Sequence, residues 1–232
     1  MSRPLVIAHR GASGHEVENS LAAFRAARAL GADAVELDVH ATADGALVVH
    51  HDEMVDATHH VAHSTARQVQ ELRLSNGEPI PFLAQALEAA GAALEVFIEV
   101  KSLAPQYDER LFDALDHGPN PPGYAVHSFD HRIVRRLGTK RPDLRRGVLS
   151  SSYLARPLAA LEDAGASILW QERTMVDTTL VETVHQAECR LIVWTVDRPE
   201  EIRRLLVLGG GVDGICTNFP DLGRRTVDEF GA

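Results

Sequence analysis

The chain has 232 residues, an apolar fraction of 45% and a formal net charge of −10. This charge argues against a nucleic-acid partner, because nucleic-acid-binding surfaces are usually basic, and two cysteines are too few to argue for a disulfide framework. No uncharged apolar stretch is long enough for a membrane span, and no basic or long apolar leader precedes Leu5, so we expect a cytoplasmic protein without membrane insertion.

Short apolar runs alternate with segments of helical spacing along most of the chain. Near the start, strands are expected at 5–9, 34–40 and 47–50, with a helix at 19–30. The Asp44-Gly45 turn lets the third run pair back on the second. The later expected strands are 94–100, 124–128, 146–149, 167–170, 190–195 and 212–216. The later expected helices are 82–91, 106–116, 131–137, 155–164, 178–187, 199–208 and 222–230.

Eight strands, each followed by a helix, predict an α/β fold of the (β/α)₈ TIM-barrel type, with an open doubly wound sheet as the alternative. Polar residues at the C-terminal ends of most strands favour the barrel, which gathers those ends at one rim. They are His9, Arg10, Glu36, Asp38, Glu99, Lys101, His127, Ser128, Glu172, Trp194 and Asn218. No linker separates two cores, so we expect a single domain over 1–232, with a polar insertion at about 54–79 after the second strand.

Three carboxylates indicate a cation site. Glu36 and Asp38 lie two residues apart on one strand and therefore share a face, and Glu99 ends the next barrel strand. Facing carboxylates repel each other, and one divalent cation relieves that repulsion. Oxygen ligands favour Mg²⁺ or Ca²⁺. The alternative is a structural ion network with Arg10 and Lys101.

The neighbouring cations and histidines point to chemistry on a phosphate. Arg10 and Lys101 form a common type of phosphate clamp. His9 and His51 end separate strands and have the pKa range that suits a general acid and a general base. Alternation turns only one of His50 and His51 toward the site, and Asp52 could fix the tautomer of His51.

Several weaker candidates remain. Trp194 is either a core residue or an aromatic wall for a small alcohol, and Glu172 is a further candidate on the same rim. The histidines at positions 59, 60 and 63 resemble a metal site by residue type, but a polar insertion favours a solvated loop.

With these residues in place, the chain resembles the glycerophosphodiester phosphodiesterase family. The resemblance rests on AHRGASG at 8–14, ENS at 18–20, GADAVELDVHATADGALVVHHDE at 31–53, IEVK at 98–101, HSFDH at 127–131, VWTVD at 193–197 and GVDGICTNFPD at 211–221. These motifs span nearly the whole chain in the family's order. Asn218 stands where the family usually has aspartate, VENS at 17–20 replaces PENT, and DATH at 56–59 replaces DRTT in the short insertion.

The resemblance implies a TIM barrel with one divalent cation on Glu36, Asp38 and Glu99. It also implies acid–base catalysis by His9 and His51 and phosphate contact by Arg10 and Lys101, while Asn19 stands where the family has a polar rim residue. The expected reaction converts a glycerophosphodiester, a small molecule, into sn-glycerol 3-phosphate and an alcohol. The alternatives are a related phosphodiesterase acting on a lysophospholipid or another head group, and a non-catalytic phosphodiester-binding barrel.

Overall fold

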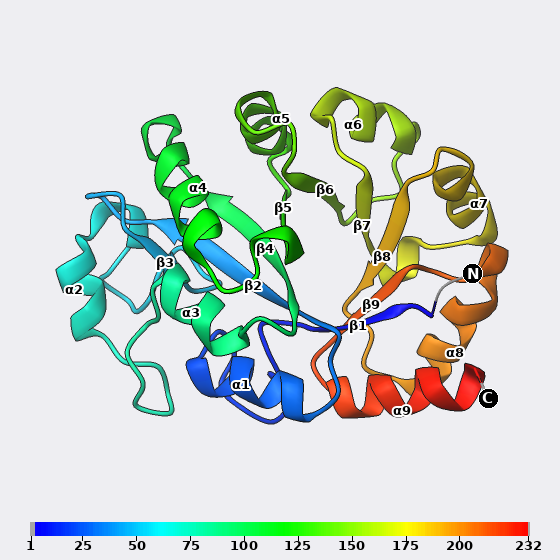
Figure 1. Cartoon of the computed structure of the whole chain (residues 1–232), viewed down its shortest axis with the longest axis horizontal. Helices are drawn as coiled ribbons and strands as arrows, with labels where there is room; N and C mark the ends of the chain where they lie inside the picture. Colours follow the sequence, from blue (N-terminus) through cyan, green and yellow to red (C-terminus); the bar gives the residue numbers. More distant parts are fainter. Residues whose placement is uncertain (1–2, 232) are drawn as a thin grey trace.

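A computed structural model describes residues 3–231. Eight parallel strands form a closed ring, with helices around its outside (Figure 1). The strands are β1 (Leu5–Ala8), β2 (Ala34–Ala41), β4 (Glu95–Ser102), β5 (Tyr124–Ser128), β6 (Arg145–Ser150), β7 (Ile168–Glu172), β8 (Arg190–Trp194) and β9 (Gly214–Thr217). Because β1 pairs with both β2 and β9, the predicted TIM barrel is confirmed and the open sheet is excluded. The predicted strand ends differ from those observed by at most two residues.

The helices follow their strands as the spacing predicts. They are α1 (Leu21–Ala29), α2 (Ala66–Glu71), α3 (Leu83–Ala90), α4 (Asp108–His117), α5 (His131–Lys140), α6 (Pro157–Ala164), α7 (Thr178–Gln186), α8 (Pro199–Val207) and α9 (Pro220–Gly231). Helix α1 begins later than predicted, because Asn19 has a left-handed φ of 56° and the Ser20 side chain caps the helix by accepting from the Ala23 N–H. Within residues 3–231, every helix is too short or too polar to span a bilayer.

One strand, β3 (Leu47–Val49), lies outside the ring. Strand β3 pairs antiparallel with β2, with Val39 opposite Val49, which confirms the predicted return of the chain. The insertion that follows contains the short helix α2 and a 3-10 turn over Val61–His63. A small apolar cluster of Val48, Val61, Val69 and Ile80 holds it against the barrel.

Apolar side chains fill the inside of the barrel below the rim. The interior cluster consists of Ile7, Ala34, Phe97, Ala125, Leu149, Ile168, Trp170, Ile192 and Cys216. Side chains two residues apart on a strand point the same way. The next inward positions after Ile7, Ala34, Phe97 and Ala125 are therefore His9, Glu36, Glu99 and His127, which stand on this apolar floor.

Candidate active site

Three carboxylates on β2 and β4 are buried together. Glu36, Asp38 and Glu99 are 3%, 1% and 7% exposed. Burial and the neighbouring Asp38 raise the pKa of Glu99 to about 7, against the opposing charge of Lys101. Burial, Asp38 and Glu99 also raise the pKa of Glu36. Burial alone would raise the pKa of Asp38, but Lys101 and Arg10 outweigh it and lower that pKa.

Asp38 is the centre of an ion network. Lys101 Nζ lies 3.1 Å from Asp38 Oδ1 and 2.8 Å from Glu99 Oε1. Arg10 Nε lies 3.3 Å from Asp38 Oδ2, to which the Asn19 amide also donates over 2.8 Å. The structural ion network left open by the sequence is therefore present around Asp38.

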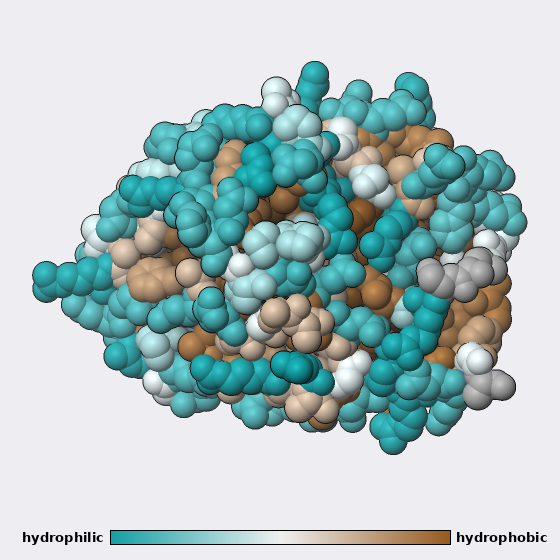
Figure 2. Space-filling model, in the orientation of Figure 1, coloured by the Kyte–Doolittle hydropathy of each residue, from teal (hydrophilic) through white to brown (hydrophobic). Residues whose placement is uncertain are grey.

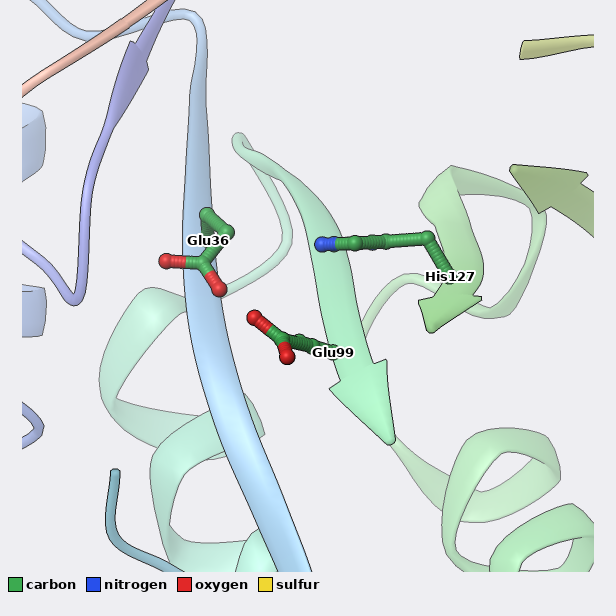
Figure 3. Close-up of side chains that lie close together, drawn as sticks. All are labelled: Glu36, Glu99 and His127. Atoms are coloured by element: carbon green, nitrogen blue, oxygen red, sulfur yellow. The ribbon is translucent and has the colours of Figure 1, made fainter. Parts of the chain in front are cut away.

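A second group of side chains can hold a metal ion. One ligand atom each from Glu36, Glu99 and His127 lies within 4.8 Å of the other two. Figure 3 shows the two carboxylates and the imidazole pointing toward one another from β2, β4 and β5. The His127 ring stacks on Trp170 at 4.2 Å, and burial lowers its pKa to about 3, so the ring is neutral, as a metal ligand must be. The Nδ1 of His127 has no hydrogen-bond partner among residues 3–231.

The turn after β1 brings Arg10 to the carboxylates. Arg10 and Gly11 have positive φ angles of 55° and 78°, and a Cβ on Gly11 would lie 2.7 Å from the backbone of Ala23. A glycine is therefore required where this turn meets α1. The resulting conformation lets the Arg10 N–H donate to Glu36 Oε2 over 3.0 Å. The backbone and side chain of Arg10 thus contact different carboxylates.

The two candidate acid–base histidines line one pocket. Each is held through Nδ1: His9 lies 2.7 Å from Asn218 Oδ1, and His51 lies 2.7 Å from Asp52 Oδ1. Burial and the nearby Arg10 charge lower the pKa of His9. His50 is absent from the pocket lining, so only His51 of this pair faces the site. The pocket is lined by His9, Arg10, Glu36, His51, Glu99, Lys101, His127, Phe129, Leu149, Trp170, Trp194 and Cys216.

Trp194 lies at the pocket wall rather than only in the core. Its ring packs edge-to-face against Phe129 at 5.6 Å, and both residues line the pocket. Phe129 is 47% exposed, so its ring is accessible from solvent. The sequence motif at 127–131 contained this residue, but a single phenylalanine after a strand gives no signal of a pocket position.

Other candidates from the sequence lie outside the pocket lining. Asn19 is buried, and its amide is committed to Asp38. Glu172 accepts from the Thr174 N–H over 2.8 Å and caps the turn after β7. In the insertion, His59 contacts Asp56 at 2.9 Å, and the His60 ring stacks on His63 at 4.4 Å. The one metal-ligand group found among residues 3–231 contains none of these three histidines.

Known proteins are similar to this chain in sequence and fold. The model of the glycerophosphoryl diester phosphodiesterase family matches residues 9–222. The chain belongs to this family. It is 36% identical to a glycerophosphodiester phosphodiesterase of Caldanaerobacter subterraneus over 94% of this chain and 96% of that protein. The expected family resemblance is therefore confirmed. The chain is an enzyme that hydrolyses phosphodiesters rather than a non-catalytic binding module.

Solved structures of glycerophosphodiester phosphodiesterases have the same fold. One from Agrobacterium tumefaciens superposes with a TM-score of 0.82 at 27% identity, covering 95% of this chain and 99% of that one. An Oleispira antarctica phosphodiesterase, whose structure holds the product sn-glycerol 3-phosphate, superposes with a TM-score of 0.89 at 22% identity, over 97% of each chain. At that lower identity, the likeness concerns the fold alone.

A second hollow lies at the opposite end of the barrel. Its lining includes Pro4, Cys189, Val212 and Phe230, near the N-terminal ends of β1, β8 and β9. Figure 2 shows a mostly hydrophilic face with an apolar patch at its right-hand edge, near α8. In TIM barrels the chemistry takes place at the C-terminal rim, so the pocket with the histidines is the active-site candidate.

The raised pKa of Glu99 predicts a pH-dependent effect of Glu99→Gln on the metal-free protein. The folded state binds the Glu99 proton more tightly than the unfolded chain, so the free energy of unfolding falls as pH rises from about 4.5 to about 7. Glutamine does not ionise, so this fall in the free energy of unfolding disappears in the variant. Asp38 still pairs with Lys101. In urea titrations, the variant should therefore be more stable than the parent at pH 8 and equal to it near pH 4.

The matched control is Glu88→Gln, which changes an exposed glutamate of α3. It should follow the parent at both pH values. Equal stability of the Glu99→Gln variant and the parent at pH 8 would show that the Glu99 carboxylate is not strained by burial.

Proposed function

We propose that this chain hydrolyses sn-glycerol-3-phospho-alcohol diesters to an alcohol and sn-glycerol 3-phosphate, using one divalent cation, Mg²⁺ or Ca²⁺. The observation that carries the proposal is the convergence of His9, His51, Arg10 and Lys101 on one pocket beside the buried carboxylates. The product held by the Oleispira antarctica neighbour supports the choice of glycerol 3-phosphate.

Glu36, Asp38 and Glu99 are the proposed metal ligands. Glu36 and Glu99 belong to the group whose ligand atoms lie within 4.8 Å of one another, and the unpartnered buried imidazole of His127 completes it. Asp38 Oδ2 is contacted by both Arg10 and Asn19, but Oδ1 is contacted by Lys101 and keeps a further lone pair for a cation. When bound, the cation supplies positive charge to the phosphoryl oxygens.

Arg10 and Lys101 are the proposed phosphate contacts. Both side chains are only partly exposed, at 18% and 17%, so their charges are weakly screened at the pocket. The oxygens of a phosphate bound between Arg10 and Lys101 would replace the Asp38 carboxylate as partners of these two cations. Trp194 and Phe129 would form the pocket wall that contacts the substrate. Asn19 would hold Asp38 in place. Glu172 would contact the substrate from the rim if it leaves its capping position.

His9 and His51 are the proposed acid–base pair. The partly buried His9 ring is neutral at pH 7, since its pKa is lowered, which suits the base that takes a proton from the nucleophile. The Asp52 carboxylate contacts His51 Nδ1 and orients the ring, and we assign His51 as the acid that protonates the leaving alcohol. The nucleophile is either water or the glycerol 2-hydroxyl, and the second route passes through a cyclic phosphate.

Product analysis tests the substrate class and the need for a cation. Glycerophosphocholine, glycerophosphoethanolamine, an artificial diester and a lysophospholipid would be incubated before chelation, after chelation, and with Mg²⁺ or Ca²⁺ restored. We expect metal-dependent release of sn-glycerol 3-phosphate from the first two. A preference for the lysophospholipid, or full activity in chelator, would contradict the proposal, and a transient cyclic phosphate would identify the 2-hydroxyl as nucleophile.

His51→Ala should lower kcat by about 10²- to 10⁴-fold, because a positioned proton donor is lost. Metal affinity should remain, since His51 is not among the proposed ligands. His50→Ala is the matched control: it removes the adjacent imidazole, which lies outside the pocket lining, and should retain activity. Near-normal turnover of the His51 variant would remove this residue from the mechanism.

A further inference from the structure

A chain of polar contacts outside the pocket reaches His9. Asn218 follows β9, and its Oδ1 lies 2.7 Å from His9 Nδ1. The Nδ2 of the same amide donates to Asp197 Oδ2 over 2.7 Å. Asp197 in turn accepts from the Asn218 N–H at 2.8 Å and from the Thr217 hydroxyl at 2.9 Å. Two donors therefore hold its other oxygen, so the carboxylate is fixed in place.

These contacts have only one consistent direction. A carboxylate can only accept, so the Asn218 side chain must turn its NH₂ group toward Asp197. Its oxygen then faces His9 and can only accept, so His9 Nδ1 must carry a hydrogen. The neutral ring is thereby held as the Nδ1–H tautomer. The lone pair lies on Nε2, the nitrogen left for the pocket that His9 lines.

We propose that Asp197 and Asn218 are positioning residues for His9: Asp197 sets the orientation of the Asn218 amide, and that amide selects the tautomer in which His9 Nε2 can accept a proton. The inference deepens the proposed function, on which the role of His9 as base rests. Without Asp197, the amide could turn over and present its NH₂ group to Nδ1. The hydrogen would then move to Nε2, and the base would be blocked.

Three variants distinguish control of the His9 tautomer from a purely structural role of Asp197 and Asn218. Asp197→Asn removes the fixed acceptor, so the Asn218 amide can take either orientation. Asn218→Asp brings two carboxylates into contact at the 2.7 Å position and breaks the same link. The double exchange, Asp197→Asn with Asn218→Asp, restores a donor at 197 facing an acceptor at 218, which again accepts from His9 Nδ1–H. Asp221→Asn, at a carboxylate that contacts His15 instead, is the matched control.

The first readout is the His9 tautomer of the Mg²⁺-loaded protein without substrate, measured by ¹⁵N–¹H NMR. The His9 signals are assigned as those lost in His9→Gln. We expect the Nδ1–H form in the parent, the control and the double exchange, and a large Nε2–H population in Asp197→Asn. An unchanged tautomer in Asp197→Asn would overturn the proposal.

The second readout is the division of the effect between kcat and KM. Outer-shell partners of this kind typically contribute about 10- to 100-fold, so kcat should fall by that factor in each single variant, with KM nearly unchanged. The double exchange should recover most of the lost turnover. A double exchange as poor as the singles, with its tautomer unrestored, would also overturn the proposal. A shifted tautomer with full turnover would instead remove His9 from its role as base, which is a failure of the proposed function.

Discussion

Three acidic side chains are packed into one buried corner of the barrel rim, and their mutual repulsion is the constraint on which the site depends. Glu36, Asp38 and Glu99 stand on an apolar floor and are almost fully buried. Burying such a cluster is costly unless each charge has a partner. Lys101 and Arg10 pair with Asp38, whereas burial and the neighbouring carboxylates raise the pKa values of Glu36 and Glu99 despite the nearby cations. A divalent cation would relieve that repulsion.

Strand register and the conformation of the loop between β1 and α1 bring these acidic side chains together. In the barrel register, Asp38 is opposite Glu99, and Glu99 is opposite His127, so three neighbouring strands bring these side chains to one level. The left-handed conformations of Arg10 and Asn19 then fold the loop between β1 and α1 over that level. The loop supplies the backbone N–H for Glu36 and the amide for Asp38. The same side chains therefore hold the loop and prepare the pocket.

Much of this could be predicted from the sequence because the strands carry a strong periodic signal. Alternation alone placed Glu36 and Asp38 on one face of a strand, and the turn at Asp44-Gly45 predicted the pairing of β3 with β2. His127 received no role, because its approach to Glu36 depends on the stagger of three strands, which periodicity does not specify. The motif around it, HSFDH, marked the strand end and supported the family resemblance, but it gave His127 no role.

Side-chain partners were harder still to predict. Asn218 looked like the loss of one rim charge, but it joins His9 to the carboxylate of Asp197, which comes from a different strand end. Glu172 looked like a rim carboxylate, but it caps its own turn. Contacts of this kind depend on loop conformation over distances of about 3 Å, and single residue types in a sequence do not encode them.

Glu36 and Glu99 are expected to hold one cation beside a phosphate bound by Arg10 and Lys101. The most direct measurement is anomalous scattering from crystals soaked with Mn²⁺ and sn-glycerol 3-phosphate. We expect a single strong peak bonded to oxygens of Glu36 and Glu99, with the phosphate in contact with both cationic side chains. A peak elsewhere with this corner empty, or a phosphate bound away from Arg10 and Lys101, would contradict the account.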